Sequence, residues 1–214
     1  MCGRYQAMDE ETNIEMRKII DEVNRRHSGT AEQQAMKTGE IRPTDIAPII
    51  GRDGPKPIRW GYPAVYGSNR PVINARQETA MSSPYFRGSV ANGRIVVPTN
   101  GFYEWMHDAN KKATDKYLFL PDGEQDMYLA GICAPFRMPD GKTEERFTIF
   151  TTAANDSMIK YHDRMPVYLG KNEIDMWLGD TKCVEEILRR QQPMLKAMLI
   201  ESPKPKSVQM SFFN

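Results

Sequence analysis

The sequence predicts a single α+β domain, and three observations lead to this fold class. The chain has 214 residues, which fits one ordinary domain with a buried core. One stretch near the N-terminus repeats its apolar residues at helical spacing, whereas the chain from Arg94 onward alternates short apolar runs with turn signals. No internal repeat, low-complexity tract or clear linker divides the chain, so we expect one domain over residues 1–214.

The first part of the chain is expected to contain one amphipathic helix followed by turns. Within residues 11–27, apolar side chains recur at positions i, i+3, i+4 and i+7. They are Met16, Ile19, Ile20 and Val23. The polar segment after this helix is expected to be a surface loop or a frayed helix. Residues 42–57 are dense in proline and glycine, which excludes a long helix and favours short strands joined by turns.

From Arg94 onward the sequence predicts a meander of antiparallel strands, then two short helices and a last strand. The expected strands of the meander cover residues 94–98, 116–120, 127–133 and 146–151. Pro-Asp-Gly sequences at 121–123 and 139–141 are typical of turns between antiparallel strands. The remaining elements are expected at residues 172–178 and 181–190, as helices, and at 194–202, as a strand.

The composition limits the classes of function that fit the chain. The formal net charge is only +1, from 29 basic and 28 acidic side chains, so any contact with nucleic acid must be local. No apolar run of eighteen residues and no secretory signal is present, and we expect a cytoplasmic protein with no membrane partner. The three cysteines form no CxxC pair and the histidines lack zinc-ligand spacing, so we expect neither a metal nor a cofactor.

One segment departs from this balance of charge. Residues 51–94 contain seven basic side chains and two acidic ones. The segment is therefore a candidate surface for an anionic partner, although arginines are also common on ordinary protein surfaces.

Cys2 is the most informative single position. Removal of Met1, which is usual before a small second residue, leaves Cys2 with a free α-amine and a thiol on adjacent carbons. The reference pKa values of these groups are about 8 and about 8.5, so both are partly deprotonated near neutral pH. Such an aminothiol condenses with an aldehyde to a thiazolidine, or attacks an amide as an N-terminal nucleophile. The alternative is that Cys2 is simply a small residue after the start codon.

Three further segments carry polar residues that a core or a loop does not require. In residues 73–80, Asn74, Arg76 and Glu78 occupy alternate positions, which places them on one face if the segment is extended. Glu104 lies among aromatic residues, which disfavour its charged form and suit a general acid or base; the alternative is a carboxylate paired with an arginine. His162 is a candidate proton shuttle or a hydrogen-bonded structural histidine.

Five short motifs occur together and in order. They are MCGR at residues 1–4, WGY at 60–62, INARQET at 73–79, NGFYEW at 100–105 and HDRMPV at 162–167. In this combination the sequence resembles the SRAP (SOS response-associated peptidase) family over residues 2 to about 169. The resemblance implies an α+β fold in which twisted antiparallel sheets form a barrel-like core with peripheral helices. It also implies covalent capture of abasic sites in single-stranded DNA, the expected partner of a monomeric protein.

The resemblance implies roles for nine residues. Cys2 is the crosslinking nucleophile, Asn74 orients its amine, Glu104 transfers protons during ring opening and condensation, and His162 assists proton transfer and crosslink reversal. The residues implied in DNA binding are Arg4, Arg76, Arg164, Thr151 and Tyr66. Cleavage of the strand as an abasic-site lyase is a further activity in this interpretation, and replication-fork proteins are partners that the sequence does not identify.

Two departures from the family pattern concern DNA binding. Where much of the family has consecutive tryptophans after the WGY motif, this chain has Tyr66 and Gly67, so less stacking on bases is expected. The usual asparagine before the apolar-Ala-Pro step is Asp45, whose carboxylate repels phosphates unless Arg4 or another cation neutralises it.

Two other classes of function remain as alternatives. An N-terminal-nucleophile amidohydrolase or (auto)peptidase also uses Cys2 at the start of the mature chain, although Arg4 and Tyr5 differ from the apolar residue and glycine of glutamine amidotransferases. A non-catalytic nucleic-acid-binding module leaves Cys2 and Glu104 without a role.

Overall fold

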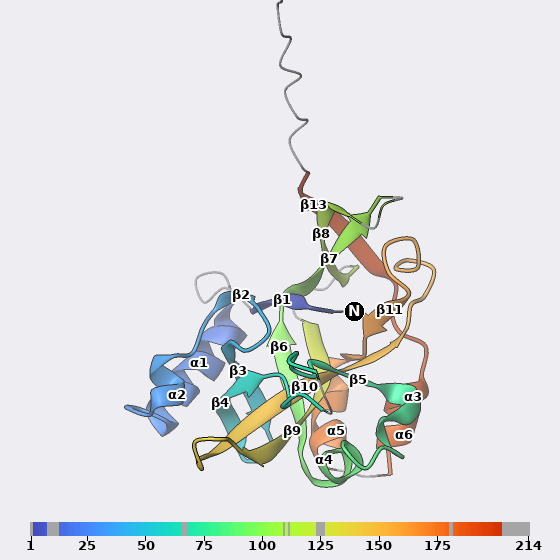
Figure 1. The fold of residues 1–214 in the computed structure, drawn as a ribbon. Coiled ribbons are helices and arrows are strands. Elements are labelled where there is room, and N and C mark those ends of the chain that lie inside the picture. The colour runs from blue at the N-terminus through green and yellow to red at the C-terminus, as the bar shows by residue number, and fades with distance from the viewer. Residues whose placement is uncertain are drawn as a thin grey trace, which may run out of the picture.

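Two β-sheets make up the centre of the molecule, and helices lie at its periphery (Figure 1). The computed structural model describes residues 2–7, 13–65, 68–108, 110, 112–122, 127–179 and 182–202. The larger sheet consists of β3 (Ile46–Gly51), β4 (Gly54–Trp60), β5 (Asn74–Arg76), β6 (Arg94–Thr99), β9 (Met127–Arg137), β10 (Thr143–Ala153), β11 (Arg164–Pro166) and β12 (Tyr168–Leu169).

Five strands of the larger sheet close into a barrel. The ring runs from β10 through β4, β3, β6 and β9 and returns to β10. Most of these pairs are antiparallel, but β10 pairs in parallel with β4 and also with β5. Closure removes free edges from the barrel strands and encloses the side chains of one face.

The smaller sheet has the strand order β13 (Leu195–Glu201), β8 (Ala113–Pro121), β7 (Gly101–His107), β1 (Arg4–Ala7) and β2 (Gly39–Ile41). All of its pairings are antiparallel. In Figure 1 it lies above the barrel, and β1 runs beside the end of β6, where the Thr99 hydroxyl donates a hydrogen bond of 2.6 Å to the carbonyl oxygen of Gln6. The N-terminal strand is thus held between β2 and β7 rather than at an edge.

The chain changes sheet at Gly101, which corrects the predicted meander. The expected strands are present, but β8 pairs in the smaller sheet with β7, a strand that was not predicted, whereas β6, β9 and β10 belong to the barrel. Gly101 has a φ of 153°, and a Cβ atom there would lie 2.5 Å from the carbonyl oxygen of Phe119. Only glycine fits this close approach of two backbones.

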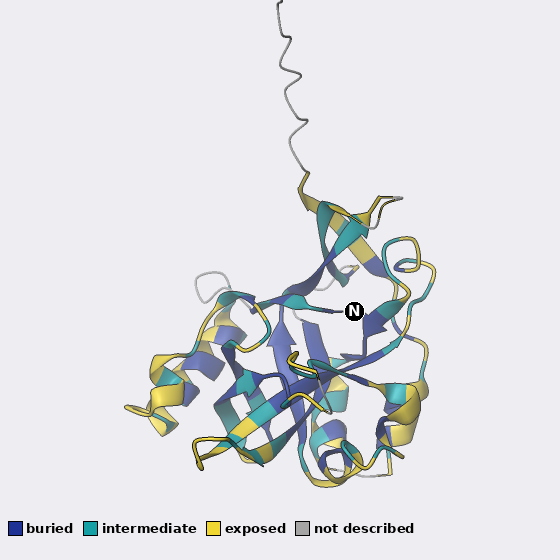
Figure 2. Cartoon of the chain, in the orientation of Figure 1, coloured by how far each residue is buried: buried dark blue, intermediate teal, exposed yellow. Residues whose placement is uncertain are grey.

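The helices cover the outside of the barrel, with exposed residues on their outer faces (Figure 2). They are α1 (Ile14–Arg26), α2 (Ala31–Gln34), α3 (Gln77–Ala80), α4 (Arg87–Asn92), the 3₁₀ helix η1 (Lys171–Glu173), α5 (Ile174–Gly179) and α6 (Val184–Arg189). Helix α1 begins after Asn13, whose side chain accepts a hydrogen bond of 2.9 Å from the backbone N–H of Met16. Its four predicted apolar residues are all buried. The expected α+β fold with a barrel-like core and peripheral helices is confirmed.

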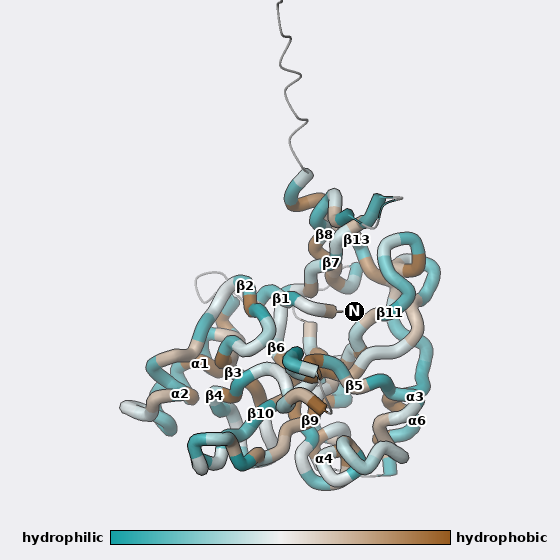
Figure 3. The backbone as a smooth tube through the Cα atoms, viewed as in Figure 1, coloured by the Kyte–Doolittle hydropathy of each residue, from teal (hydrophilic) through white to brown (hydrophobic). Residues whose placement is uncertain are grey.

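The buried apolar residues form two clusters on the two faces of the barrel wall. One cluster fills the barrel and includes Trp60, Phe147 and Ile149. The other packs between the barrel and the helices and includes Phe150 and Trp177. Figure 3 shows the corresponding apolar segments along the central strands. Along β10, Phe147 and Ile149 point into the barrel and Phe150 points toward the helices, because successive side chains of a strand lie on opposite faces.

In the part of the chain that the structure describes, none of the helices combines the length and apolar character that crossing a membrane requires.

Candidate functional site

The N-terminal strand places Cys2 at the junction of the barrel and the smaller sheet. Antiparallel pairing sets Arg4 opposite Tyr103 and Tyr5 opposite Phe102, so the residues before Arg4 lie alongside the next part of β7. Cys2 is fully buried and belongs to the apolar cluster inside the barrel. Its thiol donates a long hydrogen bond of 3.7 Å to the carbonyl oxygen of Arg4.

Asn74 holds the backbone of Cys2 from the barrel side. Asn74 begins β5, where it lies opposite Ile149 of β10. Its side-chain Nδ2 donates a hydrogen bond of 3.0 Å to the carbonyl oxygen of Cys2. Its Oδ1 is buried and has no hydrogen-bond partner among the described residues. A buried acceptor of this kind is costly unless it has a function or a partner.

Glu104 supplies a carboxyl group beside Cys2. It lies on β7 with only 6% of its surface exposed, and burial raises its pKa to about 7. Burial also raises the pKa of the Cys2 thiol well above its usual range, and the negative charge of Glu104 adds to that effect. The charges of Glu104 and the Cys2 thiol therefore interact. Near neutral pH, Glu104 can both donate and accept a proton.

His162 reaches the same region from the loop between β10 and β11. Its Nδ1 accepts a hydrogen bond of 3.0 Å from the backbone N–H of Arg164, so a neutral ring carries its proton on Nε2. The Asp163 Oδ1 lies 2.8 Å from the same Nδ1 and favours the protonated ring. Burial has the larger effect, and the pKa of His162 is lowered. The ring is therefore mostly neutral at pH 7.

A cleft of about 390 Å³ opens beside Glu104 and His162, whereas Cys2 is fully buried and, like Asn74, does not line it. Glu104 lines it from β7, and His162 lines it from the loop that precedes β11. The other lining residues are Gly3, Arg4, Trp105, His107 and Ala113. Because Gly3 lines the cleft and is adjacent to Cys2, the opening leads to the start of the chain.

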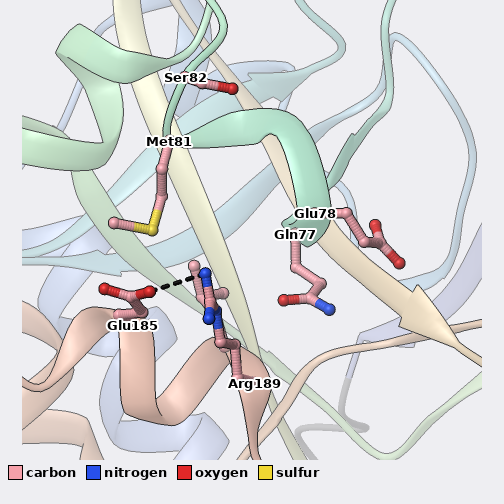
Figure 4. A pocket seen from close by; sticks show the side chains of 7 residues that line it. Gln77, Glu78, Met81, Ser82, Glu185 and Arg189 are labelled. Carbon is pink, nitrogen blue, oxygen red and sulfur yellow. Dashed lines mark ion pairs between the residues drawn. The ribbon is translucent and has the colours of Figure 1, made fainter.

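A larger hollow of about 730 Å³ lies between α3 and α6 (Figure 4). Glu78 and Gln77 line it on one side, and the ion pair of Glu185 with Arg189 on the other. Cys2, Glu104 and His162 do not line this hollow. Because Glu104 and His162 line the smaller cleft, the candidate chemistry is assigned to that cleft.

Two of the three predicted DNA-binding arginines already contact carboxylates. The guanidinium of Arg164 forms a two-pronged ion pair with Glu78, at 2.5 and 2.9 Å, and donates to the carbonyl oxygen of Thr151 at 2.7 Å. Arg4 donates to Glu40 at 2.5 Å. Arg76 is exposed at the end of β5, where it lies opposite the buried Thr151 of β10.

Three expectations about these residues need correction or completion. Glu78 does not share an extended face with Asn74, because helix α3 begins at Gln77 and turns Glu78 toward Arg164. Asp45 is neutralised by Lys37, whose Nζ lies 2.6 Å from its carboxylate, and not by Arg4. Tyr66 lies outside the described residues.

The family model described as SOS response associated peptidase (SRAP) matches residues 1–208. The chain belongs to the SRAP family. This confirms the resemblance on which the sequence-based assignment of the site residues depends.

Proteins of several organisms that are named abasic site processing proteins are similar to this chain. The abasic site processing protein YedK of Escherichia coli (strain K12) is 33% identical over 123 residues, which cover 57% of this chain and 54% of that protein. The abasic site processing protein YoqW of Bacillus subtilis (strain 168) is 29% identical over 193 residues, which cover 84% of this chain and 80% of that protein. The match to YedK thus spans about half the length of that relative.

Solved structures show the same fold. A crystal structure of a protein from Bacteroides thetaiotaomicron has a TM-score of 0.72 at 24% identity, and covers 94% of this chain and 92% of that one. The crystal structure of a phage-related protein from Bordetella bronchiseptica has a TM-score of 0.68 at 25% identity, and covers 94% of this chain and 95% of that one.

Two charged residues near the SRAP site were not predicted from the sequence. Glu40 on β2 and Lys116 on β8 form an ion pair although 76 residues separate them. Neither lies in a motif, and only the register of four strands brings them to Arg4. Among the described residues, no group of three or more histidine, cysteine or acidic side chains is arranged to hold a metal ion.

Proposed function

We propose that this SRAP protein is a DNA-repair protein that covalently captures abasic sites in single-stranded DNA through Cys2. The observation that carries this proposal is the position of Cys2, whose carbonyl oxygen is held by Asn74 beside a carboxyl group with a pKa of about 7. The names of the relatives YedK and YoqW, which are abasic site processing proteins, support the same substrate.

The chemistry requires the free α-amine of Cys2. The ring-opened abasic sugar is an aldehyde, and the amine adds to its C1 carbon to give a carbinolamine. Loss of one water molecule gives an imine, whose carbon the Cys2 sulfur then attacks. The thiol proton moves to the imine nitrogen, and a thiazolidine ring results. The net reaction joins amine, thiol and aldehyde with release of one water.

Glu104 and His162 are the proton-transfer groups in this proposal. Protonated Glu104 donates to the sugar ring oxygen as the ring opens and to the departing hydroxyl of the carbinolamine. His162, largely neutral at pH 7, exchanges protons during condensation and during reversal of the crosslink. The Oδ1 of Asn74, which has no hydrogen-bond partner among the described residues, is the acceptor that orients the Cys2 amine.

The DNA strand is bound by cations around this site. Arg76 is exposed and available to a phosphate, whereas Arg4 and Arg164 contact carboxylates in the free protein. Thr151 is buried beneath Arg164 and positions it through its carbonyl oxygen. Tyr66, which lies outside the described residues, is the remaining DNA-binding residue that the family resemblance implies. We propose that the protein acts as a monomer on DNA in the cytoplasm.

Met1 must be removed before capture, because the nitrogen of Cys2 is otherwise an amide that cannot form an imine. Protein that retains Met1 is therefore expected to give no thiazolidine. Intact-mass spectrometry of processed and unprocessed protein, each incubated with abasic DNA, tests this directly. Efficient capture by the form that retains Met1 contradicts the mechanism.

The decisive experiment is denaturing gel electrophoresis after incubation with a single-stranded oligonucleotide that contains one abasic site. A shifted band that survives denaturant and requires both the abasic site and Cys2 supports the proposal. The controls are an undamaged oligonucleotide and the Cys2→Ala variant. Shortened DNA in the same lanes reports lyase activity.

A negative result from protein shown to lack Met1 contradicts capture. Hydrolysis of glutamine or peptide amides by Cys2, the alternative use of an N-terminal nucleophile, is then the next activity to assay.

A further inference from the structure

Three cations and one carboxylate meet on one face of the smaller sheet. Glu40 accepts a hydrogen bond from Arg4 at 2.5 Å, contacts Arg42 Nε at 3.4 Å, and is bonded to Lys116 Nζ. We call these four residues the Glu40 cluster. Its formal charge is +2, because the single carboxylate of Glu40 neutralises only one of the three cations.

Strand register places the cluster on the same face as two aromatic rings. Arg4 lies opposite Tyr103, and Trp105 lies opposite Lys116. The Arg4 guanidinium is 5.3 Å from the centre of the Trp105 ring, and Lys116 Nζ is 4.1 Å from that of Tyr103. The rings thus fix the directions of the two cations independently of Glu40.

The cluster adjoins the proposed capture site, and three of its side chains are partly exposed, whereas only 12% of the Lys116 side chain is exposed. Arg4 and Trp105 line the cleft together with Glu104 and His162. About 24% of the Glu40 side chain, 32% of Arg4 and 62% of Arg42 are exposed. Lys116 hydrogen-bonds to Glu40 and, together with Arg4, lowers the pKa of that carboxyl against the opposing effect of burial. Glu40 is therefore an anion at neutral pH.

We propose that Glu40 is an internal competitor of a DNA phosphate for Arg4, Arg42 and Lys116. A phosphate of a strand entering the cleft displaces Glu40 from Arg4, and the excess positive charge of the cluster then neutralises both anions. A carboxylate and a phosphodiester each present oxygens to a guanidinium in the same way, so one can replace the other. The inference rests on the proposed binding of single-stranded DNA.

The consequence is selectivity against undamaged DNA. A strand without an abasic site must displace Glu40 and gains no covalent bond in return, so it binds weakly and dissociates. A strand with an abasic site is retained by the reaction at Cys2. Glu40 thus acts as a specificity-determining residue, although it touches none of the reacting groups.

The test measures equilibrium binding of an undamaged, fluorescently labelled single-stranded oligonucleotide over a range of salt concentrations. All variants carry Cys2→Ala, so covalent capture plays no part. Glu40→Gln is expected to bind about 3- to 10-fold more tightly than the parent at low salt, with a steeper salt dependence. Lys116→Met is expected to bind the oligonucleotide more weakly, with a shallower salt dependence.

Glu145→Gln is the matched control, because it adds the same charge. Glu145 pairs with Lys56 at 2.9 Å and does not line the cleft. Tighter binding by Glu40→Gln than by Glu145→Gln supports the proposal, whereas equal or weaker binding overturns it. If thermal unfolding shows that Glu40→Gln is destabilised, Lys116→Met becomes the deciding variant. Unchanged DNA affinity and salt dependence in Lys116→Met overturn the proposal. Weaker binding with a shallower salt dependence supports it.

The result is separable from the proposed function. Competition at Glu40 is read from undamaged DNA and does not require capture. A protein that shows the competition but forms no Cys2-dependent crosslink refutes capture alone, and one that forms the crosslink without the competition refutes the role of Glu40 alone.

Discussion

Asn74 and Cys2 are joined by a hydrogen bond of 3.0 Å between the side-chain Nδ2 and the backbone carbonyl oxygen. The bond links the first described residue of the chain to β5, which itself pairs with the barrel strand β10. The position of Cys2 is therefore set by the barrel as well as by its own strand β1. Two anchors from different sheets hold the residue that is proposed to react.

Asn74→Ala is expected to slow capture of an abasic oligonucleotide by about 10- to 100-fold. The substitution removes a buried hydrogen bond, worth about 1–3 kcal/mol when its partner is left unpaired, and each 1.4 kcal/mol corresponds to about a factor of ten. Binding of undamaged DNA should change little. Single-turnover capture rates on denaturing gels measure the effect, and an unchanged rate contradicts the role of Asn74.

Glu104→Gln is expected to slow capture by about 100-fold or more and to change its pH dependence. In the wild type the rate falls as pH rises through about 7, because Glu104 loses the proton that it donates. The glutamine variant lacks this decrease, and its rate continues to rise as the Cys2 amine, with a reference pKa near 8, is deprotonated. Rates from pH 5.5 to 9 test the difference. A parallel pH profile in both proteins excludes Glu104 as the acid.

The same carboxyl group should affect stability in a predictable direction. The pKa of Glu104 is about 7 in the folded protein and about 4.5 when unperturbed, so the folded state binds its proton more tightly. The tighter proton binding adds to the free energy of unfolding in full below about pH 4.5. This stabilisation, on the order of 3 kcal/mol, is lost as pH rises through 7. Glu104→Gln carries no such charge and is expected to gain stability relative to the wild type between pH 5 and pH 8.

Urea unfolding at these two pH values gives the comparison. The free energy of unfolding of the wild type relative to the variant should fall on going from pH 5 to pH 8. A constant difference shows that the carboxyl group is not protonated in the folded protein.

Some of these relationships are readable in the sequence and others are not. Helix α1 was predictable because its apolar period lies within thirteen residues, and the apolar strands were predictable for the same local reason. Their assignment to sheets was not, because a strand pattern shows which face is buried but not which partner it pairs with. The switch at Gly101 is visible only where its backbone meets Phe119.

The site shows the same division. Cys2 and Glu104 could be singled out because their chemistry is unusual for their surroundings in the sequence. The extended face predicted for Asn74, Arg76 and Glu78 ends at Arg76, because a helical turn starts at Gln77 and Glu78 pairs with Arg164, 86 residues away. Ion pairs at such separations depend on the tertiary fold and leave no local pattern.

Arg76→Ala is expected to weaken binding of single-stranded DNA of any sequence and to lower the slope of log affinity against log salt by about 0.7 to 1. Arg76 is exposed beside the site, so the loss should reflect one phosphate contact rather than misfolding. Arg25→Ala is a suitable control, because Arg25 is an exposed arginine that pairs with Glu22 on α1. Equal slopes for the two variants contradict a phosphate contact at Arg76.

His162 and Asp163 together make the last prediction. Burial lowers the pKa of His162, and the Asp163 carboxylate at 2.8 Å partly opposes that effect. Asp163→Asn removes the nearby negative charge, so the pKa of His162 should fall further. Any pH-dependent step that needs the protonated ring should then shift to lower pH.

His162→Ala should slow crosslink reversal by about 100-fold, because a proton-transfer group is lost. Release of a preformed crosslink, chased with excess unlabelled abasic oligonucleotide from pH 5 to 8, measures both effects; a structural role alone would leave the Asp163→Asn profile where the wild type has it.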